Sequence, residues 1–139
     1  MTQLIDDTGF VADDWRHGFA QLGEAANDAC ALHVPSHADP ATIPLGAEIV
    51  RVDFPSASDG RGFTIARMLR LRGYEGRLRA HGHVLADQYA MARRAGFDEV
   101  EIPDDLAARQ PEEQWTFRAN WREHNYQARL RGVPETADG

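Results

Sequence analysis

The residues that decide the fold run from Asp53 to Ile102 and read DFPSASDGRGFTIARMLRLRGYEGRLRAHGHVLADQYAMARRAGFDEVEI. Apolar residues recur at helical spacing in two places, near 61–72 and between 84 and 92, and each pattern is followed by a glycine suited to end a helix. Segments rich in β-branched residues flank both patterns. We predict these segments to be strands: Glu48–Phe54, Arg77–His81 and Phe97–Ile102.

Strands that alternate with helices over short connections are typical of βαβ units, which pair in parallel. We therefore expect a small single α/β domain with a mainly parallel sheet of about three to five strands, either open or resembling a fragment of a barrel. A chain of 139 residues is long enough for one such domain. The domain is assigned to residues 1–110, with its core in 46–103.

The segment before residue 46 carries weaker patterns. Cys30–Val34 is a short strand candidate that Pro35 stops, and 36–44 is predicted to be a loop. The run Asp13–Asp14–Trp15 could open a short helix.

The character of the sequence changes after residue 103. Asp104–Arg109 is predicted to be a short helix, and 111–132 is predicted to be a tail that packs on the domain or on a second subunit, because large aromatic residues need cover. This pattern predicts a homodimer, with residues 133–139 disordered. The aromatic residues expected at the interface are Trp115, Phe117, Trp121 and Tyr126.

Apolar spacing also predicts one core and the side of each element that faces it. On the first helix, Met68 and Leu71 are expected to share the buried side with the core residues. The residues predicted to line or adjoin this core are Ile49, Val50, Val52, Ile65, Leu69, Leu85, Met91, Val100 and Ile102.

Composition restricts the class of protein. The formal net charge of −7 argues against a nucleic-acid partner, and no apolar run approaches the length of a membrane span. All fifteen basic residues are arginine, which excludes lysine-based Schiff-base chemistry and a P-loop. The single Cys30 and the absence of a signal-peptide pattern at the N-terminus favour a cytoplasmic protein.

The loop from Asp59 to Gly62 follows the best strand and precedes a helix. In a parallel sheet this places it at the carboxyl ends of the strands, where backbone N–H groups and Arg61 could bind an oxyanion. The alternative is that Asp59 caps the helix and the glycines only permit the turn. The residues predicted to bind a ligand are Asp59, Gly60, Arg61, Gly62, Arg79, Asp87 and Gln88.

Other chemistry-bearing residues give weaker signals. His81 and His83 with Asp87 resemble a set of metal ligands, but no cysteine and no His-Glu-x-x-His pattern accompanies them, so we expect no metal site. The catalytic residues are unknown, because no nucleophile has a companion base. Five arginines between 67 and 79 form either a patch for an acidic partner or a solvated surface with local salt bridges.

Several motifs together resemble the bacterial DUF934 family. They are Asp59–Phe63, Ile65–Arg67, Leu69–Arg70, Gly76–Ala80, Asp87–Gln88 and Gly96–Asp98. The resemblance covers residues 50–102 well. The chain departs from the family pattern at His81 and His83 and in a short region between Cys30 and Leu45.

This resemblance implies a role in sulfite reduction, because such proteins are often described as oxidoreductases and their genes lie beside those of sulfite reductase. We expect an accessory or assembly protein of assimilatory sulfate reduction, whose partner is sulfite reductase or another enzyme of that system. The alternative is a small enzyme or binding protein that takes sulfite, sulfate or phosphate at the Asp59–Gly62 loop. The sequence identifies no cofactor and leaves open whether the chain is catalytic.

Overall fold

The structure, a computed structural model, describes residues 2–15, 18–22 and 30–118. Its centre is a seven-stranded sheet with the order β2-β1-β7-β6-β5-β4-β3. The strands are β1 (Thr2–Asp6), β2 (Gly9–Val11), β3 (Ala20–Gln21), β4 (Ala31–Val34), β5 (Ile49–Phe54), β6 (Arg77–Gly82) and β7 (Glu99–Pro103).

The sheet is open and mostly parallel, as the sequence predicts. Strands β3 to β7 pair in parallel, whereas β1 runs antiparallel to both β7 and β2. The sheet has more strands than we predicted, because β1, β2 and β3 come from the segment before residue 28. Strands of two or three residues, such as β2 and β3, are too short to show a period in the sequence.

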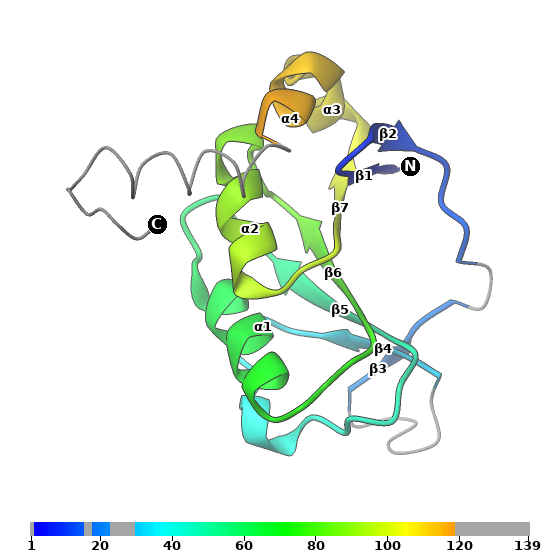
Figure 1. Ribbon diagram of the computed structural model, residues 1–139, viewed down its shortest axis with the longest axis vertical. Coiled ribbons are helices and arrows are strands. Elements are labelled where there is room, and N and C mark those ends of the chain that lie inside the picture. The colour runs from blue at the N-terminus through cyan, green and yellow to red at the C-terminus, as the bar shows by residue number, and fades with distance from the viewer. Residues whose placement is uncertain (1, 16–17, 23–29, 119–139) are drawn as a thin grey trace, which may run out of the picture.

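Two helices cover one face of this sheet. Figure 1 shows α1 (Arg61–Leu71) and α2 (Tyr89–Ala95) on the same side, while the described residues between β2 and β3, 12–15 and 18–19, lie on the other. Strands β3 to β7 follow one another without a reversal of order, and right-handed crossovers in such an order place every crossover helix on one face. The opposite face therefore lacks helical cover among the described residues. The shorter elements are η2 (Pro40–Thr42), η3 (Ala86–Gln88), α3 (Asp104–Arg109) and α4 (Glu112–Arg118).

The main core lies between the sheet and this helix layer. Alternate residues of β5, Val50, Val52 and Phe54, point into it and meet Ile65 and Leu69 of α1. The contact between β5 and α1 is close enough that a Cβ on Gly62 would lie 2.4 Å from the Phe54 ring. A glycine is therefore needed here for packing, whether or not the loop binds a ligand.

The predicted core is largely confirmed, but the buried sides of the helices differ from the prediction. Met91 is 49% exposed, and Met68 and Leu71 on α1 are exposed as well, so these expectations were wrong. Leu85 is partly buried against the core, and Ile49 is fully buried outside the main cluster. Helix α2 instead buries Tyr89, Ala92 and Ala95.

The predicted tail is partly folded onto its own domain. Trp115 of α4 is 1% exposed, and its ring packs edge-on against Tyr89 with the centroids 6.1 Å apart. The indole Nε1 donates a hydrogen bond to the carbonyl oxygen of Gln110. The expectation that Trp115 contributes to a dimer interface was therefore wrong, because its own chain covers it. Phe117 is 59% exposed, and Trp121, Tyr126 and the segment 133–139 lie outside the described residues.

The predicted helix at Asp13–Trp15 was also wrong. These residues run in an irregular segment between β2 and β3. The carboxylates of Asp13 and Asp14 bind arginines of the sheet instead of capping a helix. Asp13 still accepts a local hydrogen bond from the backbone N–H of Trp15, at 3.0 Å, but residues 12–15 form no helix.

Candidate functional site on the polar face of the sheet

The face of the sheet opposite α1 and α2 carries charged and polar side chains on four adjacent strands. Because side chains alternate along a strand, the residues between the core positions share this face. The strand register places Arg51 beside both His33 and Arg79, and His81 beside both Asp53 and Glu101. The set comprises His33 on β4, Arg51 and Asp53 on β5, Arg77, Arg79 and His81 on β6, and Glu99 and Glu101 on β7.

Arg79 is the centre of a buried ion network. Its side chain is 0% exposed, and its Nε donates to Glu99 at 2.7 Å. Its Nη1 donates to Glu101 and to Asp13, at 3.0 Å each, and Nη2 reaches the second oxygen of Asp13 at 3.0 Å. Burial alone lowers the pKa of Arg79, but the hydrogen bonds that it donates to Asp13 and the charge of Glu99 outweigh burial and raise the pKa. The guanidinium is therefore a fixed charge that holds three carboxylates together.

The segment between β2 and β3 covers part of this face. Arg77 pairs with Asp14 at 2.6 Å and with Glu99 at 2.8 Å. The Phe19 ring lies under the Arg51 guanidinium, whose central carbon is 3.9 Å from the ring centroid. This contact shields the polar network from water on one side.

Arg51 fixes the protonation of His33. The Nε of Arg51 donates to His33 Nδ1 at 2.9 Å, and a guanidinium can only donate, so Nδ1 must be the acceptor and the ring proton lies on Nε2. Burial, followed by the charge of Arg51, lowers the pKa of His33 to about 4. His33 is therefore a neutral imidazole at neutral pH.

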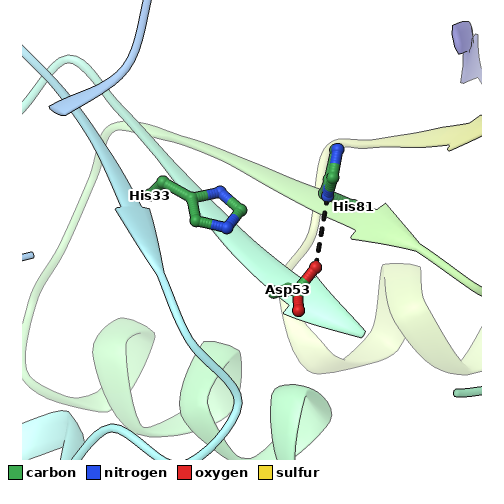
Figure 2. A group of neighbouring side chains, drawn as sticks. All are labelled: His33, Asp53 and His81. Atoms are coloured by element: carbon green, nitrogen blue, oxygen red, sulfur yellow. Dashed lines mark hydrogen bonds and ion pairs between the residues drawn. The ribbon is translucent and has the colours of Figure 1, made fainter. Parts of the chain in front are cut away.

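His81 and Asp53 lie next to His33 near the carboxyl ends of their strands. Figure 2 shows the His81 ring above Asp53, with Nδ1 of the ring 3.3 Å from Oδ1 of the carboxylate. The two imidazole rings meet edge to face with their centroids 5.4 Å apart. One ligand atom from each of the three residues lies within 4.8 Å of the others, and all three residues are half-buried. Two imidazoles and a carboxylate in this arrangement can hold a cation or transfer a proton.

The turn after His81 requires a glycine. Gly82 has a φ of +116°, and a Cβ there would lie 2.5 Å from the carbonyl oxygen of Phe54. This turn ends β6 and separates His83, which is exposed, from the cluster on the sheet face. The sequence grouped His81 with His83 and Asp87 as possible metal ligands. In the structure, the side chains that lie near His81 are His33 and Asp53.

The two charged residues of the predicted loop site bind each other. Asp59 accepts hydrogen bonds from Nη2 of Arg61 at 2.7 Å, from Nε at 3.0 Å and from the backbone N–H of Arg61 at 3.1 Å. The Arg61 hydrogen bonds hold the pKa of Asp59 well below its usual range. Nη2 of Arg61 also donates to the buried Ser36 at 3.0 Å. Gly60, and not Asp59, occupies the N-cap position of α1 and makes no side-chain cap, while Asp59 binds the backbone N–H of Arg61 from one position earlier. The structural alternative therefore holds in part, and the ligand role of the loop stays a prediction.

Of the remaining predicted site residues, Gln88 binds the loop between β5 and α1, whereas Arg79 and Asp87 lie elsewhere. Arg79 lies in the network on the polar face of the sheet. Gln88 accepts from the backbone N–H of Leu85 and donates to the carbonyl oxygen of Ala57, which joins η3 to the loop after β5. Asp87 is exposed and lines a separate hollow of about 470 Å³. A ligand role for these residues remains a prediction.

Comparison with known proteins gives one match. Residues 31–135 match the family described as bacterial protein of unknown function, DUF934. This is more than half of the 139 residues. The chain belongs to the DUF934 family. No curated protein and no solved structure matches it. The matched part of this DUF934 chain includes His33, Asp53 and His81, whereas Asp13 and Phe19 precede it.

The sequence does contain a pattern that indicates the polar face of the sheet. The prediction of ligand-binding residues did not use this pattern. Helices on both sides of a parallel sheet require strands that are apolar throughout. Here Arg51 and Asp53, and likewise Arg79 and His81, stand at alternate positions within strands. That alternation indicates one polar face. The alternation does not show which strands are neighbours in the sheet. The sequence therefore could not place His33 beside Asp53 and His81.

Proposed function

We propose that this DUF934 protein is an accessory or assembly protein of assimilatory sulfate reduction. In this proposal it acts in the cytoplasm by binding sulfite reductase or another enzyme of that system. The chain belongs to the DUF934 family, and the resemblance to that family implies a role in sulfite reduction. Family membership supports the proposal in this way. No helix among the described residues is long and apolar enough to cross a membrane.

The structural observation that carries the proposal is the outer surface of the helix layer. Leu71 is 74% exposed, Met91 is 49% exposed and Met68 is 41% exposed. Arg67 and Arg94 are exposed on the same two helices. Large apolar side chains that remain outside the core, with cations beside them, are typical of a surface that binds an acidic partner.

The structure divides the predicted arginine patch. Arg77 and Arg79 are bound to carboxylates on the polar face of the sheet. Arg70 donates to backbone carbonyl oxygens and to Asp98, and Arg72 donates to the carbonyl oxygens of Pro40 and Ile43. Of the original cluster, Arg67 is the residue that best fits a partner surface.

Affinity capture from extract of the native bacterium tests this proposal. We expect the wild-type chain to retain a sulfite reductase subunit or another sulfate-assimilation enzyme. The Leu71→Ser and Met91→Ser double variant should retain less, while Glu75→Ser, an exposed loop control, should behave like wild type. Such surface changes cost about 0.5 kcal/mol of stability or less. Failure of the wild-type chain to retain any such enzyme would count against the proposal.

A second candidate function is oxyanion binding at the Asp59–Gly62 loop. A hollow of about 280 Å³ adjoins this loop and is lined by Ser36, His37, Arg61 and Thr64, among others. Arg61 is 60% exposed, so its outer side can still meet an anion while Asp59 holds the inner side. Millimolar sulfite, sulfate or phosphate should then raise the melting temperature of wild type but not of Arg61→Gln. An unchanged wild-type melting temperature with all three anions would exclude this candidate.

A further inference from the structure

We propose that His33, Asp53 and His81 form a binding site for a divalent transition-metal ion such as Zn²⁺ or Fe²⁺. The three residues come from β4, β5 and β6, which are adjacent parallel strands. They lie near the carboxyl ends of these strands, on the face that α1 and α2 leave uncovered (Figure 2). This site is independent of the partner surface on the helix layer.

The spacing of the ligand atoms fits a metal ion. Bonds of about 2.0–2.1 Å from a tetrahedral zinc ion place neighbouring ligand atoms about 3.3 Å apart. His81 Nδ1 and Asp53 Oδ1 are already 3.3 Å apart. The ligand atom of His33 lies within 4.8 Å of the others, so it must approach by about 1.5 Å at most.

The kind of ligand restricts the kind of ion. Two imidazole nitrogens and one carboxylate favour zinc, iron or a similar transition metal, whereas magnesium and calcium prefer oxygen ligands. Three protein ligands leave at least one coordination position for water or another molecule. The half-buried position of all three residues gives an ion access from solvent.

Arg51 must release His33 when a metal binds. If the ion takes Nδ1 of His33, the lone pair that accepts the Arg51 hydrogen bond is used. If the ion takes Nε2, the ring proton moves to Nδ1, which then cannot accept. In both cases the bond of 2.9 Å between Arg51 and His33 is incompatible with metal binding.

The released guanidinium has an acceptor beside it. Nη1 of Arg51 already lies 3.5 Å from Oε1 of Glu101, and the Phe19 ring packs under its central carbon. Arg51 therefore holds His33 in the metal-free protein and can move toward Glu101 in the metal-bound form. Its positive charge also opposes the ion. Arg51 thus lowers the metal affinity.

Calorimetric titration of the metal-free protein with zinc tests the site, with cobalt as a spectroscopic substitute. We expect one ion per chain and the intense visible absorption of four-coordinate cobalt. His81→Gln and Asp53→Asn should each lower the affinity by about 100-fold or more, whereas His83→Gln, an exposed control outside the cluster, should bind like wild type. Melting curves of all variants show whether each is folded.

Two results would overturn the site. One is a folded wild-type protein that binds neither ion at millimolar concentration. The other is binding that His83→Gln weakens as much as His81→Gln, which would indicate adventitious binding by surface histidines. Arg51→Met tests the competition, because it should tighten zinc binding several-fold. Unchanged or weaker binding in that variant would contradict the role of Arg51.

Discussion

Arg79 and its carboxylates illustrate how single residues stabilise the polar face. A fully buried guanidinium is stabilised here by Glu99, Glu101 and Asp13, which supply oxygens to all three of its nitrogens. Removing one member of such a group leaves the other charges buried without compensation. The network therefore ties β6, β7 and the segment between β2 and β3 to one another.

The first prediction concerns this network. Arg79→Met should lower the free energy of unfolding by about 3 kcal/mol, because Glu99 and Glu101 would lose their central buried cation and keep only Arg77 and the more distant Arg51 as ion-pair partners. Urea denaturation measures the loss. Arg67→Met, on the exposed surface of α1, is the control and should stay within about 0.5 kcal/mol of wild type. Equal stability of the two variants would show that the network contributes little.

The second prediction concerns pH. Burial raises the pKa of Glu101, but hydrogen bonds from the Thr2 hydroxyl and Arg79 outweigh burial and hold it below 4.5. A carboxyl group whose pKa is lower in the folded state than in the unfolded state stabilises the fold when the pH is above its unfolded-state pKa. This contribution is lost as the pH falls through the folded-state pKa. Thr2→Val should thus cost about 1 kcal/mol at neutral pH and progressively less below pH 4.5. A difference that grows on acidification would contradict this assignment.

At the scale of the secondary-structure elements, Trp115 is the main buried residue of α4. The third prediction is that Trp115→Ala lowers the free energy of unfolding by about 3–5 kcal/mol, because it removes a buried ring packed against Tyr89. Met91→Ala on α2 is the control, since Met91 is exposed and should cost about 0.5 kcal/mol or less. Thermal or urea unfolding compares them. If Trp115→Ala were as stable as wild type, α4 would not be an anchored part of the domain.

The positions of most elements and the inward sides of the strands could be predicted from periodicity, but the buried sides of the two helices could be predicted only in part. The four strands from β4 to β7 and helix α1 lie where the spacing of apolar residues places them. In the short helix α2, Met91 and Tyr89 are both large and apolar enough to be buried. Tyr89 is the buried residue because the ring of Trp115 in α4 packs against it. The candidate cluster was missed for a related reason: His33 joins Asp53 and His81 only through the pairing of β4 with β5.

At the scale of the whole molecule, the oligomeric state stays a prediction. Trp115 is buried within its own domain, so it cannot contribute to a dimer interface, whereas Phe117 is exposed. The exposed apolar residues of α1 and α2 provide a second surface that a dimer could use. Light scattering on the full-length protein at tens of micromolar should give the mass of a dimer if the prediction holds, and the mass of a monomer would refute it.

The central claim, an accessory role in sulfite reduction, is tested most directly by growth of a deletion strain on defined sulfur sources. We predict growth on sulfide and cysteine but not on sulfate or sulfite, with growth restored by the wild-type gene. The Leu71→Ser and Met91→Ser double variant should restore growth poorly if the helix layer binds the partner. Unimpaired growth of the deletion strain on sulfite would contradict the account.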